Sequence, residues 1–276
     1  MIYRILCVFT LLYGLNCNAR RPSLRIYGGK DADMKKFPFA ILMELYIFGT
    51  IEGVDVSRYF GFCSATALSS RWILTAAHCI SPIQNIPQGL EAQLFVSYNT
   101  TGKPERKKIL EMFQSPNVYM ENKEIVKNDI GLAKTDDIPL PFYAKLSPVD
   151  YLSLIGQEAI YLGYGKTKTM FDKGQELNTT LKMMDVMITK CDETFIRNTP
   201  NMCTVPKCGF REFLCPGDSG GTVLHSSGVI GVHSSSIGCF IPKDNPQFGR
   251  LNYAAIDVPV SPHIDWITSI RNQLKL

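Results

Sequence analysis

Beyond its first residues the sequence has no run of about 18 or more apolar residues, the length that a membrane-spanning helix requires. It also lacks a concentrated charge, because the formal net charge is +4 and the Lys and Arg residues are scattered. The densest basic run, "ERKK" at 105–108, is interpreted as a solvated loop. We therefore expect no membrane and no nucleic acid among the partners.

Metal-site patterns and repeats are missing as well. No CxxC pair is present, which argues against a zinc ribbon, and the segment 90–105 lacks the clustered acidic residues of a calcium loop. There is no internal repeat, low-complexity segment or Gly/Ser linker. We expect no metal and no cofactor. The 276 residues, 45% of them apolar, can build one large all-β unit or two smaller domains with real cores.

The N-terminus has the pattern of a cleaved secretory signal peptide. Arg4 precedes an apolar run from Ile5 to Leu15, and small or polar residues end at Ala19. As a helix this run would span roughly 16 Å, which is too short for about 30 Å of bilayer hydrocarbon. Residues 1–19 are therefore predicted to be removed, and the mature protein is predicted to be soluble, secreted and extracellular.

Short apolar or alternating runs bounded by turn residues recur along the chain and are typical of an antiparallel all-β protein. They lie at 39–48, 72–77, 93–98, 130–134, 158–165, 182–189, 221–226 and 228–234. The polar, proline-bounded stretch 134–151 is the predicted crossing between two halves. One helix is predicted at the C-terminus, with Ser261 as N-cap, Pro262 at its first position, and one apolar face of Ile264, Ile267 and Ile270.

Seven cysteines remain once Cys7 and Cys17 leave with the signal peptide. In an oxidising compartment this odd number predicts up to three disulfides and one leftover thiol, and it leaves the pairing open. Two "NTT" sequons, at Asn99 and Asn178, predict surface segments that carry N-glycans.

The segment "CPGDSGG" (215–221) places Ser219 between glycines, directly after Asp218. Taken alone the segment favours a tight turn. A serine becomes a nucleophile when a base takes its proton and a third group holds that base. His78 in "TAAHC" and Asp129 in "NDIGLAK" supply these residue types, and histidines number only four. An α/β-hydrolase would have the order Ser, acid, His, and a subtilisin Asp, His, Ser.

Together these segments resemble the chymotrypsin-like (trypsin-fold) serine proteases. The matching segments are "IYGG" (26–29), "RWILTAAHC" (71–79), "NDIGLAK" (128–134), "LGYG" (162–165), "CPGDSGG" (215–221) and "IDWI" (264–267). The resemblance implies a serine protease domain over residues 26–276, built from two antiparallel six-stranded β-barrels and a C-terminal α-helix. It also implies a serine endopeptidase that works through an acyl-enzyme.

The same resemblance implies a role for each residue of the constellation. Ser219 attacks the scissile carbonyl, His78 takes and returns the proton, and Asp129 orients the imidazole. The backbone N–H groups of Gly217 and Ser219 form the oxyanion hole. The implied disulfides are Cys63–Cys79, Cys191–Cys203 and Cys215–Cys239, with Cys208 left over and an exchange of Cys203 for Cys208 as the rival pairing.

A zymogen is also implied. The hexapeptide "RRPSLR" (20–25) ends at Arg25, and cleavage there makes Ile26 the new N-terminus. In the family this amine pairs with the aspartate before the nucleophile, which is Asp218 here. The partner that makes the cut is a trypsin-like protease. The alternative is an incidental basic propeptide.

The primary pocket departs from that of trypsin. The family position six residues before the nucleophile is Phe213, so no carboxylate selects Arg or Lys there. Ser234, Ser235 and Ser236 stand where the family usually has Ser, Trp and Gly. A shallow pocket for small residues is favoured over an apolar slot. His225 and His233 are interpreted as hydrogen-bonded structural residues.

Two further functions remain open at this level. One is a protease-like binding protein without turnover, for which the unusual pocket speaks, although all three residues of the constellation are present. The other is a hydrolase of non-peptide esters. For the leading interpretation the expected partners are a protein or peptide substrate, the activating protease and protein inhibitors.

Overall fold

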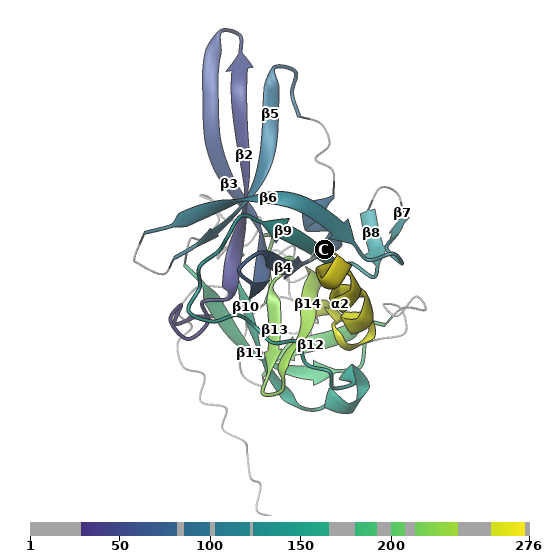
Figure 1. The fold of residues 1–276 in the computed structure, drawn as a ribbon. Helices are drawn as coiled ribbons and strands as arrows, with labels where there is room; N and C mark the ends of the chain where they lie inside the picture. The colour runs from purple at the N-terminus through teal and green to yellow at the C-terminus, as the bar shows by residue number, and fades with distance from the viewer. Residues whose placement is uncertain are drawn as a thin grey trace, which may run out of the picture.

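The structure is a computed structural model, and it describes residues 29–81, 86–99, 103–121, 124–165, 180–191, 200–207, 213–236 and 255–273. Within them the regular secondary structure is mostly antiparallel β-strands, with short 3₁₀ helices and one C-terminal α-helix (Figure 1). The strands are β1 (Lys30–Asp31), β2 (Ala40–Ile51), β3 (Val54–Ser69), β4 (Trp72–Thr75), β5 (Leu90–Tyr98), β6 (Glu105–Gln114), β7 (Tyr119–Glu121), β8 (Glu124–Lys127), β9 (Gly131–Thr135), β10 (Glu158–Gly163), β11 (Lys182–Thr189), β12 (Met202–Pro206), β13 (Thr222–His225), β14 (Gly228–Ser236) and β15 (Ala255–Pro259). The helices are η1 (Ala77–Ile80), η2 (Tyr151–Leu154), η4 (Ser261–His263) and α2 (Ile264–Gln273).

The N-terminal barrel is closed in the order β2-β3-β4-β9-β6-β5. Its interior is filled by aliphatic side chains that alternate with outward ones along each strand, as a pleated strand requires. Fully buried examples are Ile41, Ile73, Val96 and Leu132. A cystine, Cys63–Cys79, joins β3 to η1.

The C-terminal barrel is a sheet of order β1-β11-β10-β13-β14-β15-β12 that closes through an additional β11–β12 pairing. Strand β11 shows how its sequence produces this layer, because buried and half-buried residues alternate along its whole length. Strand β1 adds to the outside of the ring. The predicted fold of two six-stranded β-barrels is therefore confirmed.

Hydrogen bonds between buried polar groups join the two barrels. The buried hydroxyls of Thr66 in β3 and Thr222 in β13 lie 2.6 Å apart. Tyr164 donates its hydroxyl to the carbonyl of Ala40 at 3.0 Å. Such satisfied bonds fix the relative position of the barrels more strictly than apolar packing does, because each bond has a required direction.

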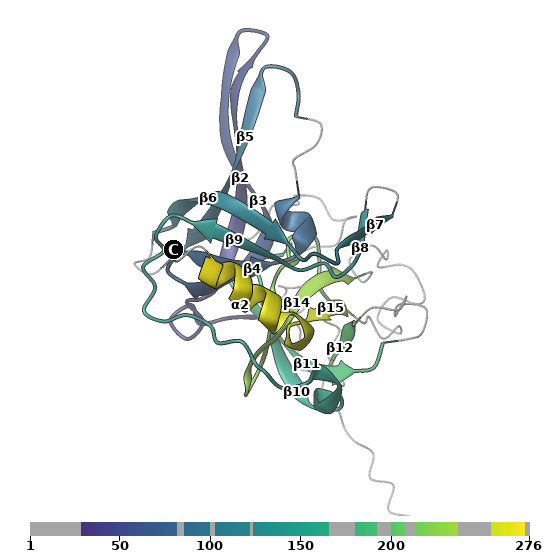
Figure 2. The same cartoon turned by 45° about the vertical axis from the view of Figure 1, so that its right-hand side comes forward.

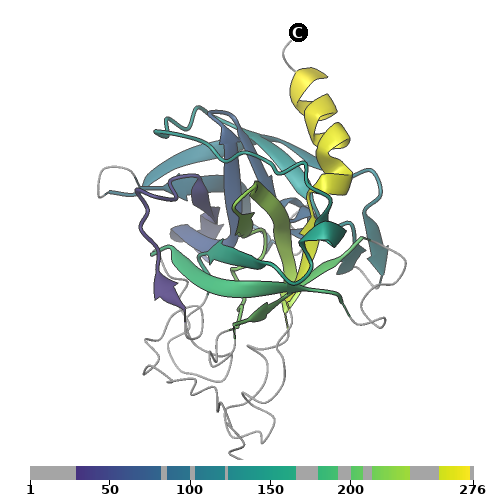
Figure 3. The same ribbon diagram turned by 90° about the horizontal axis from the view of Figure 1, so that it is seen from below.

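Helix α2 packs on the barrels through the predicted face, with Ile267 fully buried and Ile264 and Ile270 partly buried against the core. Figure 3 shows the helix at the edge of the strands. The predicted N-cap is wrong. Ser261 begins the short helix η4 instead of capping it, and its hydroxyl accepts from the Tyr151 N–H at 3.3 Å. The contact with Tyr151 therefore competes with a local cap.

No helix within the described residues is long and apolar enough to cross a membrane.

The interpretation of 105–108 as a loop is also wrong, because "ERKK" begins strand β6. The backbone there pairs with β5, and further along β6 with β9, so ladder hydrogen bonds decide the conformation. Its charges are accommodated at the surface. Arg106 binds the carboxylate of Glu44 through two hydrogen bonds of 2.6 and 3.1 Å.

The hairpin of β2 and β3 is much longer than the barrel needs. Together with β5 it forms a three-stranded arm that projects from the molecule (Figures 1 and 2). The arm ends in a two-residue turn, Glu52-Gly53, with φ of 51° and 81°. This is the type of turn that matches the twist of a two-stranded ribbon.

Candidate active site

His78 and Asp129 are brought together by two neighbouring strands. Strand β4 ends at Thr75, just before η1 and His78, and β9 begins at Gly131, just after Asp129. Thr75 and Gly131 are direct partners in the β4–β9 ladder. Because the strands are antiparallel, the end of one and the start of the other lie at the same edge of the barrel.

Two hydrogen bonds join His78 to the Asp129 carboxylate. Nδ1 of His78 lies 2.7 Å from Oδ2 of Asp129, and the His78 backbone N–H donates to Oδ1 at 2.9 Å. Asp129 is buried, with 3% of its side chain exposed, whereas 36% of the imidazole is exposed. An ionised carboxylate can only accept, so Nδ1 carries its proton and Nε2 is left as the acceptor.

The Asp129 carboxylate also changes the pKa of the His78 imidazole. Partial burial by itself would lower the pKa of His78, but the hydrogen bond to Asp129 and the negative charge of that residue outweigh burial. The pKa of His78 is therefore raised above its ordinary value of 6.5. The ring thus gains basicity while one of its edges remains accessible to solvent.

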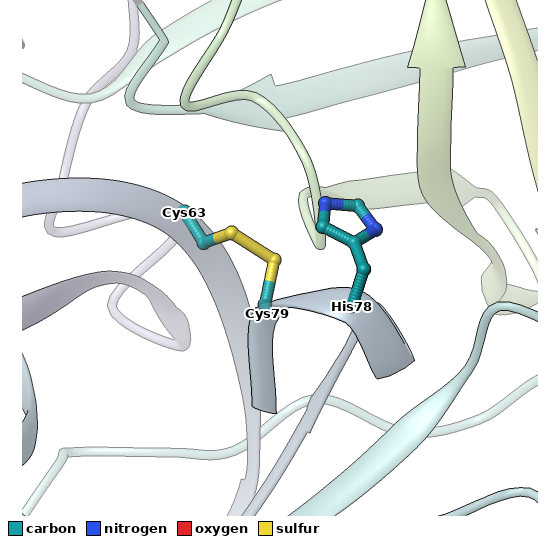
Figure 4. A group of neighbouring side chains, drawn as sticks. All are labelled: Cys63, His78 and Cys79. Carbon is teal, nitrogen blue, oxygen red and sulfur yellow. A yellow bond between two sulfur atoms is a disulfide. The ribbon is translucent and has the colours of Figure 1, made fainter. Parts of the chain in front are cut away.

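A disulfide fixes the residue that follows the base. Cys79 is bonded to Cys63 of β3, so the predicted pairing is present, and His78 stands beside it (Figure 4). The donor atoms of Cys63, His78 and Cys79 lie within 4.8 Å of one another. This grouping is not suited to a metal, because both sulfurs are in the disulfide and thiolates are what a metal binds.

The loop that carries Ser219 is tied to both barrels. Ser64, the neighbour of Cys63, donates its backbone N–H to the Ser219 carbonyl at 2.7 Å, and its hydroxyl to the Gly217 carbonyl at 2.9 Å. On the other side the Gly220 N–H donates to the carbonyl of His233 in β14 at 2.8 Å. The Ser219 loop is therefore hydrogen-bonded to β3. The same strand carries Cys63, whose disulfide partner Cys79 directly follows His78.

Ser219 itself is half-buried. Within the described chain its hydroxyl makes no hydrogen bond with His78, and the N–H groups of Gly217 and Ser219 donate to no protein acceptor. Gly217 has φ of 100°, a conformation that glycine adopts without the steric cost of a Cβ. The loop thus presents two unused backbone donors next to a partly exposed hydroxyl.

Asp218 turns inward, away from Ser219. Its carboxylate accepts the backbone N–H of Cys215 and that of Gly165, each at 2.8 Å. A Cβ on Gly165 would lie 2.2 Å from this carboxyl group, which explains the second glycine of "LGYG". Burial raises the pKa of Asp218 to about 6, while the two backbone N–H bonds and the nearby His233 act in the opposite direction.

The residues assigned to the primary pocket lie around β14. Phe213 is buried, with 1% exposed. The Ser236 hydroxyl donates to the Leu214 carbonyl at 2.7 Å, and the Ser234 hydroxyl donates to Oδ2 of Asp129 at 2.7 Å. Ser234 is thus a third group on the His78 and Asp129 pair. Sequence reasoning placed it in the pocket wall and missed this contact.

Behind this wall lies a buried polar group that the sequence did not indicate. Asp257 in β15 binds Nδ1 of His233 at 3.0 Å and the Thr204 hydroxyl at 2.8 Å, with all three side chains almost inaccessible. The prediction that His233 is hydrogen-bonded and structural is confirmed. His225 is half-buried and bonds to Ser227 and Gln157. Both oxygens of Asp257 are therefore already hydrogen-bonded within the protein.

Several predicted residues lie outside the described part of the chain, namely Arg25, Ile26, Asn178, Cys208 and Cys239. The predicted Cys191–Cys203 disulfide is present, and Cys215 is disulfide-bonded. Asn99 is half-buried at the end of β5.

Comparison with known proteins agrees with this geometry. The Trypsin family profile matches residues 26–267. Trypsin 5G1 of Aedes aegypti is 23% identical, over 92% of this chain and 87% of its own length. Trypsin Tyr p 3.0101 of Tyrophagus putrescentiae is 28% identical, over 80% of this chain and 79% of its own.

A third relative, phenoloxidase-activating enzyme 1 of Spodoptera litura, is 24% identical over 88% of this chain and 66% of its own length. Among solved structures, mouse neuropsin, a serine protease, superposes with a TM-score of 0.64 at 18% identity, covering 88% of this chain and 98% of neuropsin. Since the family profile spans nearly the whole chain and the barrels agree with it, this protein belongs to the trypsin family, the chymotrypsin-like serine proteases.

Proposed function

We propose that the chain is a secreted serine endopeptidase, made as a zymogen, that hydrolyses peptide bonds through Ser219, His78 and Asp129. The observation that carries this proposal is the 2.7 Å contact between Nδ1 of His78 and Asp129, formed beside the anchored Ser219 loop. It leaves Nε2 of His78 as the base that a serine nucleophile needs.

In the proposed reaction Nε2 of His78 takes the proton of the Ser219 hydroxyl as its oxygen attacks the scissile carbonyl. The protonated His78 then gives this proton to the leaving amine, and water hydrolyses the acyl-enzyme by the same exchange. Asp129 stabilises the imidazolium, and the N–H groups of Gly217 and Ser219 bind the oxyanion. One such donor contributes roughly 3 to 4 kcal/mol to transition-state stabilisation.

The substrate preference is proposed to exclude Arg and Lys before the scissile bond. Phe213 offers no charge, and the carboxylate of Asp257 is already bonded to His233 and Thr204. A cationic side chain would be desolvated there without a partner, which is unfavourable. Small or apolar residues therefore fit better, and the bonded hydroxyl of Ser236 keeps the pocket shallow.

Activation is proposed to follow cleavage after Arg25, with the amine of Ile26 pairing with Asp218. The carboxylate of Asp218 is fully buried and has backbone N–H donors, but it forms no ion pair with Lys or Arg among the described residues. A buried charge gains most from a partner of opposite charge. Residues 1–19 would leave as a signal peptide and 20–25 as the propeptide, and the mature domain would be 26–276.

The remaining assignments belong to the same proposal. A Cys215–Cys239 disulfide and N-glycans on Asn99 and Asn178 suit a secreted, extracellular protein. The relative named phenoloxidase-activating enzyme acts, by its name, on another enzyme, which supports a protein substrate. The other partners would be a trypsin-like activating protease and protein inhibitors.

The experiment is to express the secreted chain, cleave it after Arg25 and profile a peptide library, with Ser219→Ala as the matched control. Turnover by the cleaved protein and none by Ser219→Ala is the expected result. Binding without turnover in both proteins would instead identify a protease-like binding protein. Replacing Arg25 with Gln should leave the secreted chain inactive, and full activity in that variant would overturn the zymogen proposal.

A further inference from the structure

The projecting arm of β2, β3 and β5 has an open edge that begins at the candidate nucleophile. Strand β3 pairs with β4 only from Thr66 to Ser69. Its preceding half pairs with β2 alone among the described residues. At the inner end of this half, Ser64 donates its N–H to the Ser219 carbonyl at 2.7 Å. The edge therefore leads outward from the Ser219 loop.

The register shows which backbone groups face outward. In a two-residue hairpin the pair flanking the turn, here Ile51 and Val54, is hydrogen-bonded, and the next pair is not. Along β3 the N–H and C=O of Asp55, Ser57 and Tyr59 therefore point away from β2. The opposite side agrees, because the backbone N–H of Thr50, the partner of Asp55, donates to Gly89 on the β5 side.

Two charged side chains, Asp55 and Arg58, lie exposed along this edge. Natural edge strands are commonly guarded by charges that face solvent. Here the carboxylate of Asp55 accepts the Thr50 hydroxyl at 2.9 Å, and the Arg58 guanidinium lies 5.0 Å from the centre of the Phe60 ring. Both charged side chains thus contact the arm while they remain exposed. Phe60 is 40% exposed and Val54 is 65% exposed, so apolar surface accompanies the open backbone.

The arm is rigid enough to serve as a template. Tyr46 stacks on Tyr59 with ring centres 4.4 Å apart, and Phe95 meets both rings edge-on. The Arg106 guanidinium lies 4.2 Å from the centre of the Tyr59 ring and is bound to Glu44. Cross-strand aromatic pairs of this kind stabilise a ribbon. They fix one face of the arm, and none of these contacts uses the outward backbone groups of β3.

The position of the edge also selects which part of a substrate reaches it. Ser219 lies between β3, through Ser64, and β14, through the bond from Gly220 to His233. The proposed primary pocket is on the β14 side, where Ser236 binds Leu214. Residues before the scissile bond enter on that side, so residues after it leave along β3. A chain leaving outward runs antiparallel to β3.

We propose that the outer edge of β3, residues 54–60, binds the segment of the protein substrate that follows the scissile bond, as an added antiparallel β-strand. The inference rests on the proposed endopeptidase function and deepens it. The occupant is an extended polypeptide, because main-chain donors and acceptors are what an open edge offers. Among the described residues the outer half of β5 also pairs on one side only, but β5 does not lead to the Ser219 loop.

Strand geometry gives the length of substrate required. Ser57 precedes Ser64 by seven residues, which corresponds to about 23 Å along a strand. A substrate must therefore extend about eight residues beyond the scissile bond to use the whole edge. A short substrate whose leaving group is a chromophore cannot use it at all.

The test compares two substrates with the same residues before the scissile bond, one with a chromogenic leaving group and one with ten residues after the bond. The variant is Ser57→Pro, which removes the outward N–H of Ser57, and the matched control is Ser57→Ala. Both variants lose the same 2.8 Å hydrogen bond to Tyr46, so they differ in the backbone donor.

We expect kcat/KM for the long substrate to be about fivefold lower in Ser57→Pro than in Ser57→Ala, the worth of about one hydrogen bond. The chromogenic substrate should be cleaved equally by both, which also shows that Ser57→Pro is folded. Equal cleavage of the long substrate by the two variants would overturn the inference while the endopeptidase function stands. No cleavage of either substrate by the wild-type protein would overturn both.

A second measurement uses the substrate. N-methylation at successive residues after the scissile bond should slow cleavage at every other position, because alternate N–H groups of an added strand face β3. An effect without this period of two, or none beyond the first two residues, would contradict strand addition.

Discussion

The Ser234 hydroxyl donates a hydrogen bond of 2.7 Å to Oδ2 of Asp129, the same oxygen that lies 2.7 Å from Nδ1 of His78. One carboxylate oxygen therefore serves both barrels, since His78 belongs to the N-terminal barrel and Ser234 to β14. The contact couples the position of the candidate base to that of the pocket wall.

Removing this contact should weaken catalysis without unfolding the protein. We expect Ser234→Ala to lower kcat/KM about tenfold, because a hydrogen bond to a charged group contributes about 1.5 kcal/mol. Steady-state kinetics on a chromogenic peptide will measure it. Ser234→Thr, which keeps the hydroxyl, is the matched control and should retain most of the activity. An unchanged kcat/KM in Ser234→Ala would show that the hydrogen bond from Ser234 to Asp129 does not contribute to catalysis.

Asp129 should determine the acid limb of the pH–rate profile. Its hydrogen bond and charge raise the pKa of His78 above 6.5 despite burial. Since His78 must be unprotonated to act as a base, activity should rise with pH through a midpoint above 6.5. Asp129→Asn should move this midpoint to lower pH and reduce kcat by about 10⁴-fold, through loss of the correct tautomer. A midpoint that stays in place would contradict the coupling.

Protonation of His78 affects stability and activity in opposite directions: as pH rises, activity increases and this contribution to stability decreases. A pKa raised by folding stabilises the folded state below pH 6.5, and this contribution is lost as pH rises through the folded pKa. Asp129→Asn should therefore lower the free energy of unfolding more at pH 5 than at pH 8. Urea denaturation at the two pH values measures the difference.

Because of Asp218, the gain in unfolding free energy on cleavage after Arg25 should depend on pH. Its folded pKa of about 6 exceeds the ordinary 3.8, so the uncleaved chain loses stability as pH rises through this range. In the cleaved chain the new amine would hold Asp218 ionised. With Ser219→Ala protein, the difference in unfolding free energy between cleaved and uncleaved forms should grow by about 2 kcal/mol from pH 4 to pH 6.

The control for that comparison is Asp218→Asn, in which the difference should no longer vary over this range. Equal pH dependence of the cleaved and uncleaved forms with Asp218 intact would sink the proposed ion pair.

The Cys63–Cys79 and Cys191–Cys203 disulfides should have separable effects. The Cys63–Cys79 loop has a sequence separation of 16, and the Cys191–Cys203 loop one of 12. Replacing either pair with alanine should lower the free energy of unfolding by about 3 kcal/mol. Only loss of Cys63–Cys79 should also shift the pKa of His78, as followed by NMR. Equal shifts in both variants would show that this disulfide does not position the base.

Much of the fold could be predicted from local patterns. The alternation of apolar and polar residues in β11 predicts a strand, because the pleat has a period of two. The short apolar runs of β4, β9 and β14 predict strands as well. Strand β6 was missed, because "ERKK" has no apolar alternation and its conformation comes from ladder bonds to β5 and β9. The Ser261 cap failed for a similar reason, since Tyr151 lies 110 residues away.

The sequence by itself indicated the family, whose resemblance implied the two barrels, and it named Ser219, His78 and Asp129 as the candidate catalytic residues, because the ordered motifs contain the residue types that this chemistry needs. Only the tertiary structure decided that Ser234 binds Asp129, that Asp257 is occupied by His233 and Thr204, and that β3 leaves an open edge beside Ser219. Each of these depends on segments distant in the chain, and hydrogen bonds between such segments follow from strand register, which no local pattern encodes.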